Sequence, residues 1–292
     1  MIGSLAYVAV YVALAGIASF IEMPAGRGFG AFQLNALIRV GSLAAAVVAL
    51  VFGHGPGFPA AGYLLAGLGI GLLSGVGSML YCFGLEYLPV SLVITLSNLY
   101  IVITVALGIV VLHEPVTLLK IAGLICIMAG VLVLARSPAR HAAGPEASSA
   151  GTPVQVRGLV IMGGYIVVIG VSAFLEKPAL KGLAATQLNV LMGISMTAVA
   201  GVALTVKGPK LPMTKRTLGG LGVGVMIGAA SVFYFLGLRG LPVSIASAAS
   251  NASVVVTVVL SAIFLHQLLG AARCTAIGLT LFGATLLALS TG

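Results

Sequence analysis

The chain has 292 residues, of which 60% are hydrophobic and only 7% are charged, and its formal net charge is +9. A water-soluble domain of this length could not cover its surface with so few charges, so most of the chain is expected to lie in lipid. In that setting most of the 14 Lys and Arg residues are expected to lie in the connecting loops, near the lipid headgroups. The positive charge therefore does not indicate a nucleic-acid partner.

Apolar segments of membrane-spanning length recur along the whole sequence. They predict spans at residues 4–24, 31–52, 61–87, 90–112, 116–135, 157–178, 184–206, 217–239, 243–265 and 270–289. Most connections are short and contain Gly or Pro. Residues 136–156, rich in Ala, Ser, Gly and Pro, are predicted to be a flexible linker between a first five-helix repeat, 1–135, and a second, 157–292.

The two halves of the chain share sequence. Residues 67–113 and 220–266 are identical at 21 of 47 positions at an offset of 153, and residues 20–37 and 174–191 at ten of 18 positions at an offset of 154. The matches include polar residues, which shared hydrophobicity cannot place in register. The chain is therefore predicted to contain an internal duplication.

The number of spans in each half fixes the relation between the halves. Two copies of a five-span unit must enter the membrane from opposite sides, because five is odd. The predicted fold is an all-α membrane protein with ten transmembrane helices arranged as two inverted five-helix repeats. Inverted repeats supply two similar gates that face opposite ways, and they predict a secondary transporter with its binding site between them.

Other classes of membrane protein lack support in the sequence. No filter-like loop or ring of like charges indicates a channel, and no G-x-x-x-x-G-K-[ST] motif indicates a nucleotide-driven pump. The chain contains no Asp and no H-E-x-x-H motif, and its four His are scattered, which argues against an enzyme. The three Cys lie in apolar runs without metal-ligand spacing, so neither a metal nor another cofactor is expected.

Three motifs link the sequence to a known family. The fourth predicted span ends in His113-Glu114-Pro115, the fifth contains GLICIMAGVLVL, and the tenth contains GLTLFGATLLAL. Together with the paired five-span repeats, these motifs resemble the drug/metabolite transporter superfamily, EamA type, over essentially the whole chain. The resemblance implies a central cavity lined by spans one, three, four, six, eight and nine, with spans five and ten peripheral and both termini in the cytoplasm.

Glu22 and Glu176 are candidate coupling or gating residues. They occupy equivalent positions in the repeats, each two residues before a proline, Pro24 or Pro178, that loosens the helix beside the carboxylate. Ionisable groups at membrane depth usually serve transport pathways, where a carboxylate can bind a proton or another cation. The alternative is a carboxylate at a loop edge that reaches the interface or pairs with a nearby Lys or Arg.

Arg39 is a candidate substrate-binding residue that breaks the repeat, since its partner position is Gly193. Its guanidinium could bind an anionic group of the substrate, pair with Glu22, or reach the membrane interface. The remaining candidates for substrate binding are polar residues of spans three, four, eight and nine: Tyr81, Ser97, Asn98, Tyr234, Ser250 and Asn251. The alternative for these side chains is packing between helices.

These residues predict a multi-pass transporter of the plasma (inner) membrane that moves a small polar metabolite, with an amino acid as the favoured candidate. Efflux of cationic amines or drugs is the alternative within transport, and a non-transporting scaffold or sensor is the alternative outside it. A monomer is expected to suffice. Loops after odd-numbered spans carry nine cations against four after even-numbered spans. By the positive-inside rule this places both termini outside the cytoplasm, opposite to the family resemblance.

Overall fold

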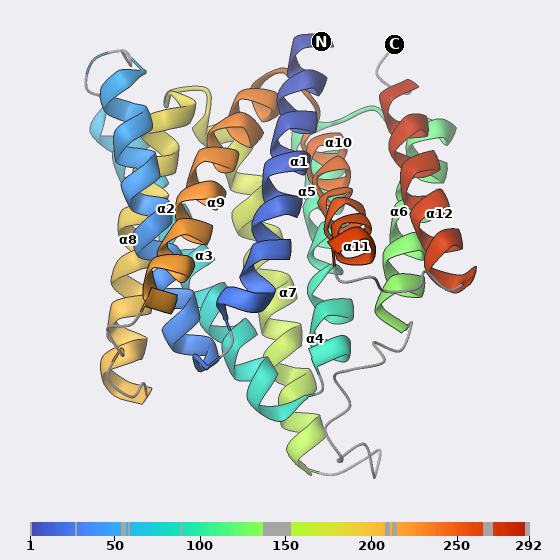
Figure 1. Ribbon diagram of the computed structural model, residues 1–292. Helices are drawn as coiled ribbons and strands as arrows, with labels where there is room; N and C mark the ends of the chain where they lie inside the picture. Colours follow the sequence, from blue (N-terminus) through green and yellow to red (C-terminus); the bar gives the residue numbers. More distant parts are fainter. Residues whose placement is uncertain are drawn as a thin grey trace.

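The computed structural model describes residues 2–26, 28–53, 57, 59–88, 90–136, 153–207, 211, 215–264 and 271–289. These residues are helical apart from short connections (Figure 1). The helices are α1 (Ile2–Ala25), α2 (Ala31–Phe52), α3 (Ala61–Tyr87), α4 (Val90–Ser97), α5 (Tyr100–Leu112), α6 (Leu118–Arg136), α7 (Pro153–Ala179), α8 (Ala185–Lys207), α9 (Lys215–Gly240), α10 (Val243–Ser250), α11 (Ser253–Phe264) and α12 (Ala271–Leu289).

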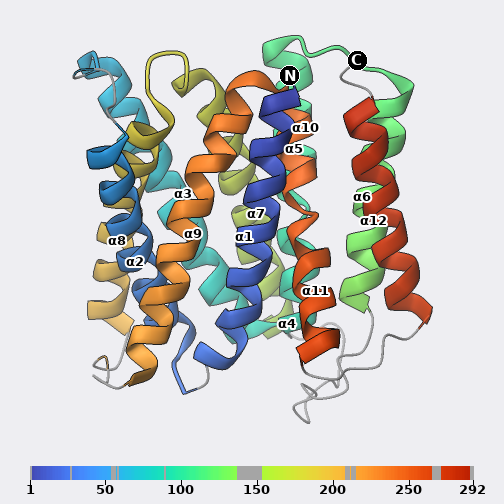
Figure 2. The same ribbon diagram turned by 45° about the horizontal axis from the view of Figure 1, so that its top comes forward.

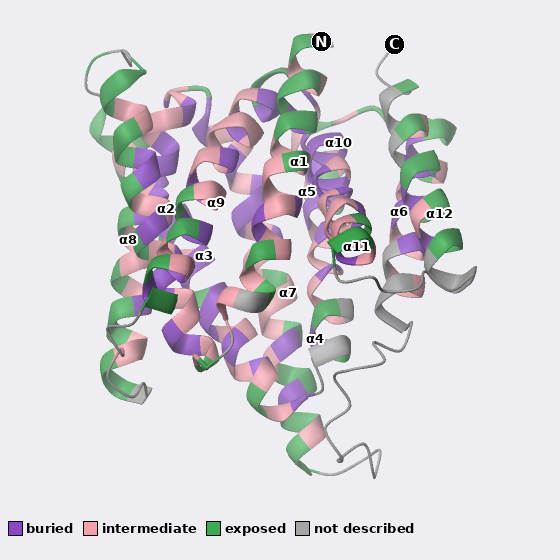
Figure 3. Cartoon of the chain, viewed as in Figure 1, coloured by how far each residue is buried: buried purple, intermediate pink, exposed green. Residues whose placement is uncertain are grey.

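The helices form ten spans, which confirms the predicted all-α membrane fold. Seven helical stretches are long and apolar enough to cross a membrane, and three shorter apolar helices, Tyr100–Leu112, Leu118–Gly130 and Cys274–Gly283, belong to the remaining spans. Large apolar side chains such as Val51, Leu65 and Val110, each 70% exposed, point away from the protein interior. Exposed residues lie along the outer helices in Figure 3, where lipid rather than water would cover them.

The two halves run in opposite directions through the bundle. α1 begins and α12 ends at one face, the termini face, whereas α6 ends and α7 begins at the other, the linker face (Figures 1 and 2). α7, the counterpart of α1, therefore runs antiparallel to it. The predicted inversion of the repeats is confirmed by this arrangement.

The halves interlock through their third and eighth spans. α3 packs on α7 and α8 of the second half, and α9 packs on α1 and α2 of the first half. α6 and α12 pack on each other to one side of the bundle (Figure 2). This agrees with the peripheral position that the family resemblance implies for spans five and ten.

Equivalent hydrogen bonds join the fourth span to the sixth and the ninth to the first. The Thr104 hydroxyl donates to the Gly170 carbonyl oxygen at 3.0 Å, and the Thr257 hydroxyl donates to the Gly16 carbonyl oxygen, also at 3.0 Å. The four residues are partners in the sequence repeat. The duplication therefore preserves individual side-chain contacts as well as the helix arrangement.

Glycines explain how closely the halves approach. A Cβ on Gly71 of α3 would lie 2.5 Å from the Met192 Cα of α8, and a Cβ on Gly224 of α9 would collide with the Ile38 backbone of α2. Ile38 and Met192 are themselves partners in the repeat. The glycine ladders of spans three and eight are thus contact faces between helices, as small residues commonly are in membranes.

Replacing Gly71 with Ala is expected to destabilise the protein by about 1–3 kcal/mol, the usual cost of overpacking a tight contact. The matched control is Gly69→Ala on the same helix, because a Cβ there meets nothing within 4 Å. Thermal unfolding of the purified variants in detergent measures the difference. Equal melting temperatures for the two variants would contradict the assigned packing.

The fourth and ninth spans differ from the continuous helices predicted over 90–112 and 243–265. α4 and α5 are separated at Asn98, and α10 and α11 at Asn251, the equivalent position. Backbone hydrogen bonds tighten to a spacing of three residues at both breaks, for example from the Leu99 amide to the Leu96 carbonyl at 3.0 Å. Asn side chains compete for backbone groups, which explains a break at this residue type.

The predicted linker, 136–156, lies mostly outside the described residues. α6 ends at Arg136 and α7 begins at Pro153, within the C-terminal end of the predicted segment. The flexibility expected for residues 137–152 falls outside the described part of the chain. The boundaries of the two repeats stay a prediction.

Candidate functional site

A cavity of about 540 Å³ lies between the two halves. Its charged and amide lining residues are Glu22, Asn35, Arg39, Glu176 and Asn189. Its hydroxyl-bearing lining residues are Tyr11, Ser42, Ser74, Ser78, Tyr81, Tyr100, Tyr165, Ser231, Tyr234 and Ser250. Residues of α2 and α8 contribute to the lining, in addition to the spans that the family resemblance implies. None of the described lining residues comes from α6 or α12.

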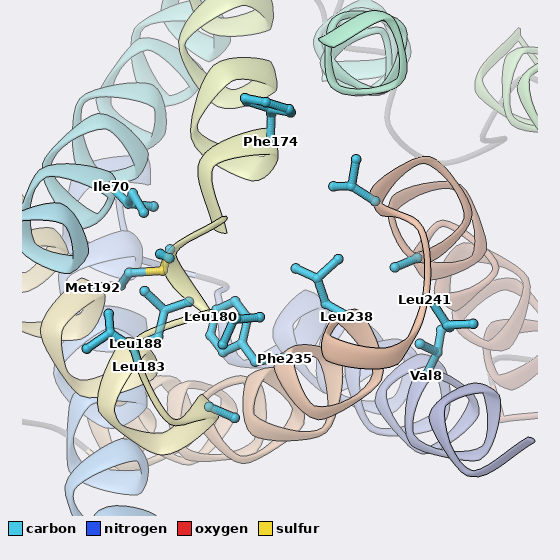
Figure 4. Close-up of a cluster of buried hydrophobic side chains, with 14 residues drawn as sticks. Val8, Ile70, Phe174, Leu180, Leu183, Leu188, Met192, Phe235, Leu238 and Leu241 are labelled. Atoms are coloured by element: carbon cyan, nitrogen blue, oxygen red, sulfur yellow. The ribbon is translucent and has the colours of Figure 1, made fainter. Parts of the chain in front are cut away.

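An apolar plug closes the cavity toward the termini face. Its members include Leu180 and Leu183 of the α7–α8 connection and Phe235 and Leu238 of α9. Figure 4 shows Leu180, Leu183 and Leu188 beside Phe235. Leu180 and Leu183 are only 5% and 1% exposed, whereas their repeat partners at the linker face, Gly26 and Phe29, are partly exposed.

The linker face is the open side of the cavity. The lining reaches Ala31, the first residue of α2, Glu22 near the end of α1, and Leu85 near the end of α3, and all three are partly exposed. On the opposite side the lining stops at Glu176 and at Phe235, which is itself a member of the plug. The two ends of the path are therefore in different states, although the halves that build them are repeats.

Glu114 fastens the closed end. Its carboxylate, in the connection between α5 and α6, accepts hydrogen bonds from the Val243 amide and the Ser244 hydroxyl at the start of α10. It also pairs with the Lys120 ammonium at 3.0 Å, with the two side chains only 7% and 4% exposed. A carboxylate at a helix N-terminus satisfies free amide groups and complements the helix dipole. Glu114 thus ties a loop of the first half to the broken helix of the second.

Two cations complete the closure at the termini face. The Lys177 ammonium donates to the carbonyl oxygens of Leu238, Arg239 and Leu241, at 2.5, 2.9 and 2.8 Å, where α9 ends. Arg239 in turn donates to the Leu183 carbonyl oxygen at 2.6 Å. The repeat partners of Lys177 and Arg239 are Met23 and Glu86, which cannot make these bonds at the linker face.

Arg39 is held in place at the side of the cavity nearer the linker face. Its Nε donates to the side-chain Oδ1 of Asn35 at 3.2 Å, and a terminal nitrogen donates to the Ser78 hydroxyl at 2.7 Å. Within the described chain its hydrogen-bond partners are these two residues and not Glu22. Glu22 lines the same part of the cavity, and the two charges interact over a longer distance.

Glu176 lies deep in the cavity among tyrosines. Its side chain is only 8% exposed, and its charge acts on the hydroxyls of Tyr11, Tyr100 and Tyr234. The rings of Tyr11 and Tyr234 lie 5.1 Å apart between centroids. Among the described residues no donor forms a hydrogen bond to the Glu176 carboxylate.

A second tyrosine pair occupies the equivalent place near Glu22. The rings of Tyr165 and Tyr81, the repeat partners of Tyr11 and Tyr234, lie 5.8 Å apart. The symmetry fails at two further positions, because Arg39 corresponds to Gly193 and Tyr100 corresponds to Ser253. The two halves of the cavity are therefore chemically different.

The structure brings most of the predicted site residues to this cavity. Six of them line it: Glu22, Arg39, Tyr81, Glu176, Tyr234 and Ser250. Three others, Ser97, Asn98 and Asn251, are not among the lining residues. Whether any of the nine binds substrate or couples transport stays a prediction.

The two asparagines lie at the helix breaks instead of facing the cavity. The Asn98 amide nitrogen donates to the Ile94 carbonyl oxygen at 2.7 Å, so its side chain completes the backbone bonding of α4. Asn251 is 7% exposed, and its side-chain amide nitrogen, Nδ2, has no hydrogen-bond partner among the described residues. The helices are broken at these two positions, and neither amide is among the residues that line the cavity.

Several polar lining residues, among them Tyr11, Tyr165 and Asn35, were not among the predicted site residues. These three were visible as polar matches between the repeats, since Tyr11 pairs with Tyr165 and Asn35 with Asn189. The contacts of Glu114 with α10 had no such signal, because its repeat partner is Gln267. Its position in the His113-Glu114-Pro115 motif was the available clue.

Replacing Asn98 or Asn251 with Leu is expected to lower the maximal transport rate about tenfold with little change in apparent affinity, since mid-helix breaks commonly serve as hinges. A substrate-binding role predicts the reverse, a loss of affinity. Initial rates over a range of substrate concentrations in proteoliposomes separate the two. Ser97→Ala, beside the first break, serves as the control variant.

The inverted repeats, the polar cavity between them and the different states of its two ends define a membrane transporter. A model of the EamA-like transporter family matches residues 2–136 and 156–289, and the chain belongs to this family. The family is one of transporters and not of enzymes. Among solved structures, one described as "Crystal structure of protein" superposes with a TM-score of 0.81 at 17% identity, covering 98% of this chain and 96% of that chain. That likeness shows a shared fold. Among curated proteins, none matches the sequence.

Proposed function

We propose that this membrane transporter is a secondary transporter that moves a small polar metabolite across the plasma (inner) membrane by alternating access. The cavity between the inverted halves carries the proposal. It contains two carboxylates and a guanidinium, Glu22, Glu176 and Arg39, and its lining extends to the linker-face ends of α1, α2 and α3. A path that is open at one end and plugged at the other is the arrangement that alternating access requires.

The chemistry of the lining supports a polar substrate. A buried charge or amide is costly in a membrane unless it serves the transport path or another polar group. A zwitterion such as an amino acid would complement both signs of charge in the cavity, so an amino acid is the substrate we favour. Efflux of a cationic amine is the alternative, supported by the excess of carboxylates over cations in the lining.

A scaffold or sensor would not need a charged cavity that reaches one face. The cavity is built within one chain, because both halves of its wall come from the two repeats, and this supports a monomer as the working unit. The contact of Glu114 with the start of α10 holds the termini-face end of the path, and this further supports a protein that changes the side to which the cavity opens.

Counterflow in proteoliposomes tests the proposal. Vesicles that contain the purified protein are loaded with an unlabelled amino acid, amine or nucleobase and diluted into the labelled compound. Transient accumulation of label, absent from vesicles without protein, is the expected result for at least one amino acid. Binding of such a compound without counterflow would identify a sensor, and counterflow of amines alone would select the alternative substrate class.

A further inference from the structure

We propose that Glu176, together with Tyr11, Tyr100 and Tyr234, forms the subsite that binds the protonated amino group of the substrate. The inference rests on the proposed function, since it assigns a role to one end of the transport cavity. It also separates Glu176 from Glu22, which the sequence repeat presents as equivalent.

The surroundings of Glu176 lack a counter-ion. Its side chain is 8% exposed at the cavity wall, and within the described ranges no donor forms a hydrogen bond to its carboxylate. The adjacent cation, Lys177, directs its ammonium at the carbonyl oxygens of Leu238, Arg239 and Leu241 instead. A carboxylate withdrawn from water without a partner is costly. A cation that arrives with the substrate would supply the missing partner.

The tyrosines add a second attraction for a cation. Tyr11, Tyr100 and Tyr234 come from α1, α5 and α9, and all three line the cavity. They line the same cavity as Glu176, and the Tyr11 and Tyr234 rings are 5.1 Å apart with a 50° tilt. Aromatic faces attract ammonium groups through their quadrupole, and more strongly when water is excluded.

The equivalent carboxylate has different surroundings. Glu22 shares its end of the cavity with Arg39, whose charge acts on it. No tyrosine corresponds to Tyr100 in the second half, where Ser253 occupies the position. The Glu22 and Arg39 charges offset each other, so Glu176 is the unbalanced charge in the cavity wall.

An ammonium group is common to amino acids and to simple amines, and Arg39 distinguishes them. Arg39 uses two of its donors on Asn35 and Ser78, and a guanidinium has five. An amino acid bound with its ammonium at Glu176 could direct its carboxylate toward the remaining donors. A simple amine would leave them unused.

The experiment measures binding of three matched probes, phenylalanine, 2-phenylethylamine and 3-phenylpropionate, to the purified full-length protein in detergent. The wild type is compared with Glu176→Gln, Glu22→Gln, Tyr100→Leu, Arg39→Gln and the exposed-carboxylate control Glu86→Gln. Leucine with its matched amine and acid provides a second set of probes. Melting temperature and gel filtration verify that each variant is folded.

Glu176→Gln is expected to weaken binding of the amino acid and of the amine at least about tenfold, as loss of a charge-assisted contact does. Binding of the acid should not weaken in Glu176→Gln. Tyr100→Leu should also weaken binding of the amine. Loss of amino-acid affinity in Arg39→Gln, with amine affinity kept, identifies a zwitterion as the substrate. Wild-type binding of the amine but not of the amino acid, weakened in Glu176→Gln and kept in Arg39→Gln, identifies the amine instead.

Equal affinity of the wild type and Glu176→Gln for every ammonium-bearing probe overturns the inference. So does a loss in Glu22→Gln as large as that in Glu176→Gln, because the proposal assigns the subsite to one carboxylate. Counterflow of some solute by Glu176→Gln with wild-type kinetics would overturn the subsite while leaving the transport function intact. Absence of counterflow by the wild type with every solute would instead refute the proposed function itself.

Discussion

Replacing Glu114 with Ala is expected to destabilise the folded protein by about 3–5 kcal/mol, the cost of removing one partner of a buried ion pair. The change leaves the Lys120 ammonium, with a side chain only 4% exposed, without its carboxylate. It also removes the acceptor that binds the Val243 amide and the Ser244 hydroxyl at the start of α10. Thermal unfolding of the purified variant in detergent measures the effect.

The partner cation provides the control for this prediction. Adding Lys120→Met to Glu114→Ala removes the unpaired charge, so the double variant is expected to recover part of the lost stability. Glu86→Ala, which removes an exposed carboxylate, should change the melting temperature little. A Glu114→Ala protein that melts within about 2 °C of the wild type would show that Glu114 does not fasten the termini face.

Glu22→Gln is expected to abolish substrate accumulation driven by a proton gradient while counterflow continues. Glu22 lies at the end of the cavity that reaches the linker face, where the positive charge of Arg39 acts on it. A carboxylate in such a place can exchange a proton with water and so link transport to the gradient, whereas Gln cannot change its charge. The accumulation ratio in proteoliposomes should fall to about one, from about ten or more for a gradient of one pH unit coupled to one proton.

The gradient must be imposed in both directions, because the loop charges place both termini outside the cytoplasm, whereas the family resemblance places both inside it. Counterflow in the same vesicles serves as the control for folding and for an intact path. Wild-type transport that ignores both gradients would identify facilitated diffusion. Glu22 would then be a charge of the cavity entrance without a coupling role.

The sequence was sufficient to predict the fold because its repeats carry polar residues in register. Glu22 with Glu176 and Asn98 with Asn251 established the offset between the halves, and the odd number of spans in each half then required inversion. The ladder that contains Gly71 predicted the contact face of α3, since small residues leave few other roles in a membrane helix. These inferences need only periodicity and counting.

The details of the site depended on geometry that the sequence does not encode locally. The helices break at Asn98 and Asn251, and the Asn98 side chain bonds to the backbone of its own helix instead of lining the cavity. The contact between Glu114 and α10 joins residues 129 and 130 positions apart. Hydropathy treats a helix as continuous and cannot indicate which distant carboxylate will cap it, so the closed end of the path emerged only from the folded chain.

The most direct test of the account is the side from which a cysteine in the cavity reacts. Ser231 lines the cavity, and Ser231→Cys would be made in a protein whose three native cysteines, Cys82, Cys126 and Cys274, are replaced by Ser. A membrane-impermeant thiol reagent is then applied separately to each side of the membrane. The account predicts reaction from the linker face in the absence of substrate, and added reaction from the termini face once Glu114→Ala releases the closed end. Equal reaction from both faces in the protein that retains Glu114 would contradict a single path that opens alternately. Reaction from neither face, in the presence or absence of Glu114, would contradict it as well.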